Sequence, residues 1–279
     1  MTDLIQKKLE SYFSRNHEEE ENAIKEITQE VALYGLFKAG FFEKASFQGG
    51  TCLRILYGLD RFSEDLDFAL DRPDPSFSLQ PYLDHAVSVM KVYGYQIEIS
   101  GRDKTDSNVK MRFLKDDSMI NMLSFRHQSE PSKKIKIKIE IDVNPPQGSK
   151  SEIRYCDFPI DFTVKAHEPS SLFSGKIHAL LCRPYVKGRD WYDFAWYVSR
   201  RTEINLPFLS SALQQMGPFK DQGSVIDLVW VKTQLSSRIE SMNWSQARDD
   251  VRRFVKPEKL EVLELWGKEF FLSKVDKLL

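Results

Sequence analysis

Residues 47–68 read FQGGTCLRILYGLDRFSEDLDF, and this stretch is the most informative in the chain. Two adjacent glycines, Gly49 and Gly50, separate a short apolar segment from a segment of helical character that begins at Thr51. Glycine allows positive φ angles and close backbone approach, and the amide groups at a helix start suit a phosphate. Residues 65–70, DLDFAL, alternate polar and apolar side chains as a strand does. The stretch therefore predicts an anion site beside a strand.

Asp65 and Asp67 lie two residues apart on this predicted strand. Because side chains alternate along a strand, both carboxylates project from one face while Leu66 and Phe68 enter the core. Paired carboxylates beside a phosphate-binding turn are the arrangement that a site for Mg²⁺ and a nucleotide requires. Either feature alone is common in turns and exposed strands, so it is their occurrence on adjacent elements that favours a site.

A second strand, KKIKIKIEIDV at 133–143, has isoleucines on one face and charged residues on the other. Asp142 on the charged face is the candidate for a third carboxylate, which would bind a metal and act as general base for an attacking hydroxyl. Glu140 shares this face and is the competing choice. The lysines beside them would bind triphosphate or polynucleotide, or would simply keep the face exposed.

The rest of the chain divides into a mixed part and a helical part. Helices are predicted at 20–38 and 80–93, and strands at 95–100 and 109–124. From residue 170 onwards the expected elements are the helices 171–182, 190–200, 206–215, 222–241, 244–254 and 257–277. This order predicts an α+β domain over residues 1–168 and an all-helical domain over residues 169–279.

A second informative segment, KIHALLCRPYVKGRDWYDF, spans residues 176–194. Lys176 and Arg183 lie two turns apart on one helix face, and Lys187 and Arg189 form a basic loop before a helix expected to begin at Asp190. A structural alternative makes Asp190 an N-cap and places Asp193 in the first turn for its favourable interaction with the helix dipole. The clustering of four cations and two acids within 18 residues favours a site.

Composition excludes several other classes of protein. The 279 residues carry 40 Lys+Arg and 41 Asp+Glu, and no apolar run is long enough to span a membrane. The first residues lack the apolar core of a secretion signal, so we expect a cytoplasmic protein. Three cysteines without a CxxC pair, and five histidines without HxxxH, argue against a disulfide framework, a zinc-thiolate site and a histidine metal site.

Both segments resemble the AbiEii/AbiGii toxin family of nucleotidyltransferases. The first matches the pattern GGTxLR followed by RxSxDLDF, at Gly49, Gly50, Thr51, Leu53, Arg54, Arg61, Ser63, Asp65, Leu66, Asp67 and Phe68. The second matches Lys, Arg, Lys and RDxxD, at Lys176, Arg183, Lys187, Arg189, Asp190 and Asp193. The resemblance covers roughly residues 45–200. Its 14-residue spacer between Gly50 and Asp65 is a little longer than in polymerase-β-like enzymes generally, but the toxin branch accepts it.

The resemblance implies a polymerase-β-like nucleotidyltransferase domain with a mixed sheet, and a helical domain that contributes Lys, Arg and Asp residues to the cleft. It implies that Asp65 and Asp67 bind the metal and that Gly49, Gly50 and Thr51 form the phosphate loop. Lys176 resembles the lysine at the nucleotide phosphates, and either Asp190 or Asp193 the catalytic acid of the second motif. The remaining motif residues expected at the nucleotide or its phosphates are Arg54, Ser63, Arg183, Lys187 and Arg189.

The implied activity is metal-dependent transfer of a nucleoside monophosphate from an NTP to an acceptor hydroxyl, with Mg²⁺ or Mn²⁺ as cofactor. The family implies the 3′ end of tRNA as acceptor and a cognate antitoxin as partner. Basic residues available for an RNA backbone are Arg200, Arg201, Arg248, Arg252, Arg253 and Lys256. The alternatives are transfer to a small molecule or a protein side chain, and a non-catalytic nucleotide- or RNA-binding relative.

Overall fold

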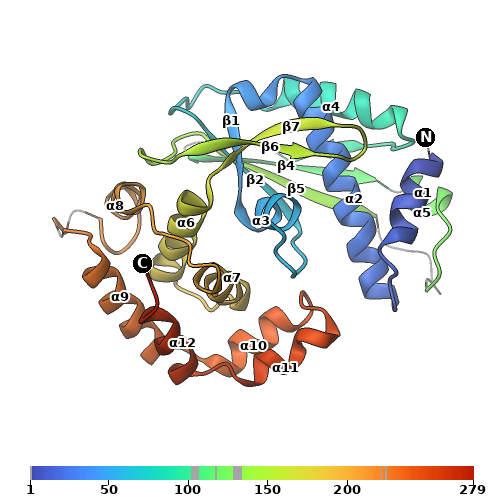
Figure 1. Ribbon diagram of the computed structural model, residues 1–279. Coiled ribbons are helices and arrows are strands. Elements are labelled where there is room, and N and C mark those ends of the chain that lie inside the picture. Colours follow the sequence, from blue (N-terminus) through green and yellow to red (C-terminus); the bar gives the residue numbers. More distant parts are fainter. Residues whose placement is uncertain (1, 102–106, 117, 128–133, 221, 224) are drawn as a thin grey trace. The chain divides into compact units, whose positions relative to one another are not determined.

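A computed structural model describes residues 2–101, 107–116, 118–127, 134–220, 222–223 and 225–279. The strands are β1 (Ala45–Gln48), β2 (Asp65–Leu70), β3 (Glu98–Ser100), β4 (Val109–Asp116), β5 (Ile135–Asp142), β6 (Ser151–Cys156) and β7 (Phe162–His167). The helices are α1 (Thr2–Ser11), α2 (His17–Lys38), α3 (Gly49–Tyr57), α4 (Gln80–Val92), α5 (Ser118–Met122), α6 (Pro169–Cys182), α7 (Gly188–Ser199), α8 (Leu206–Gln215), α9 (Leu228–Glu240), α10 (Trp244–Arg252), α11 (Leu260–Glu264) and α12 (Lys268–Val275). Figure 1 shows the strands in the first part of the chain and the helices α6 to α12 after them.

The strands form one mixed sheet in the order β3-β4-β5-β2-β1-β7-β6. Strand β1 pairs antiparallel with β2 and parallel with β7, and β2 pairs parallel with β5. Strand β4 is antiparallel to both β3 and β5. The prediction of an α+β fold with a mixed sheet is confirmed.

Strict alternation along β5 explains why this segment is a strand with one buried face. Its isoleucines at 135, 137, 139 and 141 are at most 4% exposed, whereas the residues between them are half-buried or exposed. On β2, Phe68 packs against Phe47 of β1 and Phe41, with ring centroids 5.2 and 4.9 Å apart. These apolar side chains build the core on one face of the sheet and leave the polar side chains of β2 and β5 on the other.

The strand predicted at 109–124 ends earlier than expected. Strand β4 ends at Asp116, and the helix α5 follows, so the prediction is wrong beyond this residue. The Asp116 carboxylate accepts hydrogen bonds from the backbone N–H of Met119 at 2.9 Å and from the Ser118 hydroxyl at 2.7 Å. A side-chain acceptor of this kind stabilises the start of a helix in place of a strand.

The chain divides into two compact units. The first contains Met1–Tyr57, Ser63–Pro145 and Ile153–Ala166, and the second contains Gly58–Phe62, Pro146–Glu152 and His167–Leu279. The second unit thus holds the helices from α6 onwards together with two short segments from earlier in the chain. One of these segments, Gly58–Phe62, connects α3 to β2 and lies within the first of the two sequence motifs.

The helix predicted at 257–277 is interrupted. The structure has a 3-10 turn at Pro257–Lys259, then α11 and α12, because Gly267 between them is fully extended. The helix predicted at 222–241 begins only at Leu228, where the Asp227 side chain accepts from the Trp230 N–H at 2.8 Å. Residues 117, 133 and 224 of the predicted segments lie outside the described residues.

Within the described part of the chain, no helix has the length and apolar character needed to cross a membrane.

Candidate functional site

Gly49 begins α3 directly after β1, and its position strongly favours glycine. Its φ is +79°, which disfavours other residues, and a Cβ at this position would overlap the carboxylate of Asp67. The backbone of the turn therefore lies against the side chain of the second aspartate of β2. Gly50 follows as the second residue of α3. The predicted phosphate loop and the predicted metal ligand are thus neighbours in the first unit.

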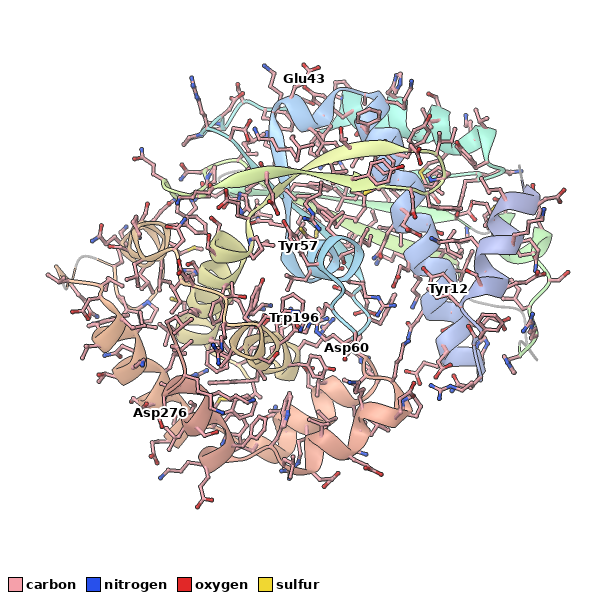
Figure 2. All side chains as sticks on the ribbon, viewed as in Figure 1. Tyr12, Glu43, Tyr57, Asp60, Trp196 and Asp276 are labelled. Atoms are coloured by element: carbon pink, nitrogen blue, oxygen red, sulfur yellow. The ribbon has the colours of Figure 1, made fainter. Side chains whose placement is uncertain are left out.

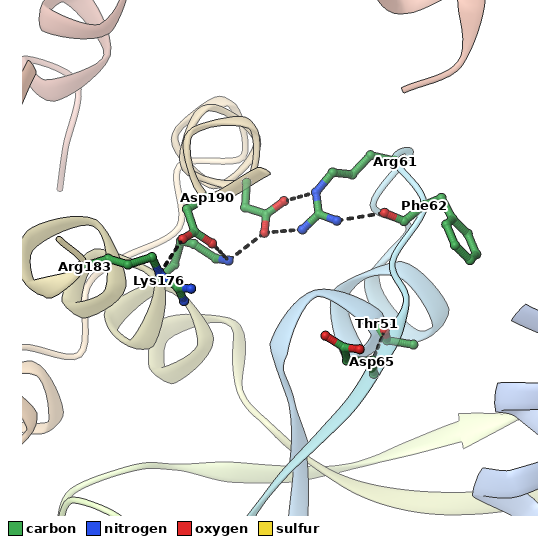
Figure 3. Close-up of polar contacts among 8 residues, drawn as sticks. Thr51, Arg61, Phe62, Asp65, Lys176, Arg183 and Asp190 are labelled. Carbon is green, nitrogen blue, oxygen red and sulfur yellow. Dashed lines mark hydrogen bonds and ion pairs between the residues drawn. The ribbon is translucent and has the colours of Figure 1, made fainter. Parts of the chain in front are cut away.

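Thr51 fastens α3 to the start of β2. Its hydroxyl donates to the backbone carbonyl of Asp65 at 2.5 Å, and the residue is fully buried (Figure 3). This contact holds the backbone of Asp65 rather than presenting a hydroxyl to a ligand. Thr51 thereby fixes the distance between the glycine turn and the first aspartate.

The pairing of β2 with β5 decides which charged side chains share a face with the two aspartates. Asp65 is the register partner of Lys138 and Asp67 that of Glu140, whereas Asp142 is paired with Ala69. Paired residues on adjacent strands present their side chains on the same face. Glu140 therefore lies directly beside Asp67, and Asp142 lies one step further along the sheet, away from the glycine turn.

Glu140 and Asp142 also differ in their contacts. Glu140 forms an ion pair with Lys138, with 2.7 Å between the Nζ and Oε2 atoms, and both side chains are about 30% exposed. Burial lowers the pKa of Lys138, but Glu140, Asp65 and Asp67 outweigh this effect, so that the pKa is raised. The Asp142 carboxylate accepts from the backbone N–H of Asn144 at 2.9 Å, and burial raises its pKa.

The donor set on this face suits a hard divalent cation. Carboxylate oxygens are the ligands that Mg²⁺ prefers, and Mg²⁺ is commonly held by one or two carboxylates together with substrate phosphates. Asp65 and Asp67 provide such a pair beside the glycine turn. Among the described residues there is no preformed group of three His, Cys, Asp or Glu side chains at a metal-binding spacing.

Two other residues of the first motif are engaged within the protein. The Arg54 guanidinium on α3 pairs with Glu26 on α2, with 2.6 Å from Nε to Oε2 and 3.3 Å from Nη2 to Oε1. Tyr12, labelled in Figure 2, donates to the same carboxylate at 3.0 Å. Ser63 is buried, and its carbonyl accepts from the side chain of Gln29. Both predicted phosphate-binding residues thus stabilise the packing around α2.

The second motif forms a buried network of charges in the second unit. The Lys176 ammonium lies 2.7 Å from Asp190 Oδ1 and 2.8 Å from Asp193 Oδ2. Arg183 contacts the other oxygen of Asp190 at 3.2 Å (Figure 3). Asp190 and Asp193 are at most 2% exposed. The two aspartates that the sequence could not tell apart therefore both bind Lys176, but only Asp190 contacts Arg183.

Asp193 has a further partner that sequence reasoning missed. Arg61 donates from Nε and Nη2 to the two carboxylate oxygens, at 2.6 Å each, and from Nη1 to the Phe62 carbonyl at 2.8 Å (Figure 3). Arg61 is 2% exposed. Its only sequence signal is that it occupies the arginine position of the first motif. Nearby, Asp60 (Figure 2) accepts a hydrogen bond from the Tyr192 hydroxyl at 2.8 Å.

The charges of the network shift the pKa values of its members. Burial raises the pKa of Asp190, but Lys176, Lys187 and Arg183 outweigh burial and lower it to about 2. Burial lowers the pKa of Lys176, yet Asp190 and Asp193 raise it overall. Burial also lowers the pKa of Lys187. Asp190 is therefore a carboxylate and Lys176 an ammonium at neutral pH.

The start of α7 differs from the expectation that Asp190 caps this helix. The helix begins at Gly188, with Lys187 at the N-cap position, so the N-cap alternative for Asp190 is wrong. A Cβ at Gly188 would overlap the backbone carbonyl of Ala247 on α10, which explains the glycine. Arg189 stacks over the ring of Phe254, with 4.0 Å to its centroid.

The residues suggested for an RNA backbone are engaged in different ways. Arg200 stacks on Trp196 at 3.9 Å and Arg253 on Phe254 at 4.7 Å. Arg248 donates to the Trp266 carbonyl, and Arg252 pairs with Glu264 at 3.4 Å. Cations stacked on aromatic rings are compatible with contacts to phosphates or bases, but such stacking is also common on protein surfaces.

Comparison with known proteins identifies the family of the chain. The family model described as nucleotidyl transferase AbiEii toxin, type IV TA system, matches residues 31–272. Similar solved structures include a candidate nucleotidyltransferase from H. pylori, with a TM-score of 0.49, 16% identity and 88% of each chain covered. Another is JHP933 from Helicobacter pylori, with a TM-score of 0.46, 17% identity and 88% of each chain covered. No curated protein matches the chain. Because the family match includes both motifs, the chain belongs to the AbiEii family of nucleotidyltransferase toxins.

Proposed function

We propose that this nucleotidyltransferase uses Asp65 and Asp67 to transfer a nucleoside monophosphate, in a metal-dependent reaction, from an NTP to an acceptor hydroxyl. The observation that carries the proposal is the contact between the Gly49 backbone and the Asp67 side chain. A backbone turn suited to phosphate and a carboxylate suited to a cation lie next to each other there. In this reaction the acceptor oxygen bonds to the α-phosphorus, the bond from this phosphorus to the bridging oxygen breaks, and pyrophosphate leaves.

Asp65, Asp67 and Glu140 would hold the cation. When bound, Mg²⁺ or Mn²⁺ supplies positive charge that offsets the charge of the triphosphate. The register of β2 and β5 supports Glu140 as the third carboxylate, because Glu140 is opposite Asp67. Asp142 is the alternative, and its raised pKa would suit a general base that accepts the proton of the acceptor hydroxyl.

The charge balance of the second motif supports a role at phosphates. Arg61, Lys176 and Arg183 bring three positive charges to the network, whereas Asp190 and Asp193 bring two negative charges. The remaining positive charge, with that of Lys187 and Arg189, favours an anionic ligand. In this proposal Lys176 and Arg183 bind nucleotide phosphates, Asp190 orients Lys176, and Asp193 holds Arg61 and Lys176 in place.

We further propose an RNA acceptor, the 3′ end of tRNA, and a cognate antitoxin as partner. The family description as a toxin of a toxin–antitoxin system supports the antitoxin. The arginines stacked on Trp196 and Phe254 support contacts with a nucleic acid. Modification of tRNA at its 3′ end would stop translation, which accords with a toxin.

A labelling experiment tests both the reaction and the acceptor. The full chain and its Asp67→Asn variant are incubated with each α-labelled NTP, Mg²⁺ and total RNA, and the products are separated on a denaturing gel. We expect label in a tRNA-sized band with the wild type and with an Asp84→Asn control, but not with Asp67→Asn. Periodate oxidation of the RNA 3′ ends beforehand should remove the label.

Other labelling results would contradict either the proposed acceptor or the proposed site. Label that survives periodate would exclude the 3′ end as acceptor. Label in protein or in a small molecule would leave the nucleotidyl transfer in place and change the acceptor class. Equal labelling by the wild type and Asp67→Asn would contradict the proposed site.

A further inference from the structure

Lys138 is the cation nearest to the proposed metal ligands in the strand register of β2 and β5. It lies opposite Asp65, and its ammonium forms an ion pair with Glu140 at 2.7 Å. Glu140 in turn lies opposite Asp67. A lysine thus lies on the same face as the three carboxylates, opposite the first residue of β2.

Three carboxylates on one face of two adjacent strands repel one another unless a cation is present. Like charges directly opposite or diagonal across a strand pair destabilise the sheet. The ion pair between Lys138 and Glu140 is only partly screened by water, because about 30% of each side chain is exposed. Lys138 therefore supplies positive charge to this face without any bound metal.

The same charge must oppose a divalent cation that binds to these carboxylates. An ammonium near the cation repels it, and a carboxylate oxygen engaged by the ammonium is less available as a ligand. We propose that Lys138 is a positioning residue. Its ammonium forms an ion pair with Glu140 in the metal-free protein and competes with the divalent cation for this carboxylate. This inference rests on the metal site of the proposed function.

The competition gives Lys138 a specific effect on metal affinity. Without Lys138, the carboxylates bind a cation more tightly, but the metal-free protein is less stable. With Lys138, the cation is held weakly unless a triphosphate adds further ligands, so metal and NTP binding favour each other. A lysine that served only as a triphosphate contact would leave the affinity for the metal alone unchanged.

The test is direct titration of the full chain with Mn²⁺ in the absence of nucleotide. Binding is measured by calorimetry and by the electron paramagnetic resonance signal of free Mn²⁺. The variants are Lys138→Met and Lys138→Gln, which remove the charge, and Lys138→Arg, which keeps it. Lys136→Met is the matched control, because Lys136 lies on the same face of β5 but stacks over the ring of Phe113.

We expect both neutral variants to bind Mn²⁺ at least about fivefold more tightly than the wild type, from the loss of a nearby like charge. Lys138→Arg and Lys136→Met should bind within about twofold of the wild type. The melting temperature of Lys138→Met should be lower without metal and should rise more steeply with Mn²⁺.

Two results would overturn the inference, and they differ in what else they remove. Equal or weaker Mn²⁺ binding by both neutral variants would overturn the role of Lys138 and leave the metal site intact. Absence of Mn²⁺ binding by the wild type and by both neutral variants would overturn the metal site of the proposed function, and the role of Lys138 with it.

Discussion

The guanidinium of Arg61 binds both carboxylate oxygens of Asp193, and the two residues are separated by 132 positions in the sequence. Arg61 belongs to the first motif and Asp193 to the second, and both residues lie in the second compact unit. Lys176 contacts the same carboxylate. Both motifs therefore contain a residue whose observed partner is a residue of the other motif.

We expect Asp193→Asn to destabilise the protein by ~3–5 kcal/mol, because it leaves Arg61 buried without its carboxylate. Arg61→Met should cost a similar amount, since it removes one partner of Asp193. The double variant should be more stable than the sum of the two losses predicts. Urea unfolding monitored by tryptophan fluorescence measures all three changes.

The exposed ion pair between Arg252 and Glu264 is the control for this prediction. Its side chains are 50% and 68% exposed, so Glu264→Gln should cost less than about 1 kcal/mol. An equally small cost for Asp193→Asn would contradict the structural importance of the buried pair.

Gly49→Ala should impair both stability and activity. An alanine at this position would have to adopt a positive φ, and its Cβ would lie about 3.0 Å from Cβ and Cγ of Asp67. We expect a loss of ~1–3 kcal/mol in stability and, because Asp67 must move, about a hundredfold loss in kcat. Steady-state kinetics and thermal unfolding measure the two effects.

Gly58→Ala separates the strain from the displacement of Asp67. Gly58 also has a positive φ, +75°, but no atom lies within 4 Å of a Cβ there. This variant should lose about 1 kcal/mol of stability and keep its kcat. If both variants lost activity equally, the contact with Asp67 would not be the cause.

The choice between Glu140 and Asp142 is open to a kinetic test. If Glu140 is the third carboxylate, Glu140→Gln should lower kcat at least about a hundredfold. Asp142→Asn should then change kcat only a few-fold, because Asp142 lies beside Ala69 and further from the glycine turn. The reverse pattern of kcat values would identify Asp142 instead.

Asp190 should give the protein a stability that is lost in acid. Its pKa is lowered to about 2 in the folded protein, below its ordinary value, so the stabilisation is complete above about pH 4 and disappears as pH falls towards 2. The difference in urea midpoint between the wild type and Asp190→Asn should therefore shrink across this pH range. A difference that stayed constant from pH 6 to pH 2 would contradict the ionised state of Asp190.

Local patterns predicted the elements of the first motif. The alternation of Leu66 and Phe68 with Asp65 and Asp67 is a property of the strand itself, and the glycines mark the turn before it. The isoleucines of β5 indicated its buried face for the same reason. These features could be predicted because each depends on residues that are neighbours in the sequence.

Features that depend on tertiary pairing could not be predicted. The register of β5 against β2, which sets Glu140 opposite Asp67, arises from contacts between strands that are distant in sequence. The glycine at position 188, where α7 begins, is explained by close packing against Ala247. Asp193, the partner of Arg61, is also distant in sequence. The motif therefore indicated an arginine at position 61 but not the residue that it binds.

Nucleotidyl transfer at Asp65 and Asp67 is tested by parallel reactions with α-labelled and γ-labelled NTP, using the wild type and Asp67→Asn with Mg²⁺ and total RNA. We expect the wild type to transfer the α label to the acceptor and to release the γ label as pyrophosphate. Asp67→Asn should do neither, although its melting temperature should be that of the wild type. Transfer of the γ label to the acceptor, or full activity of Asp67→Asn, would contradict nucleotidyl transfer at the carboxylates of β2.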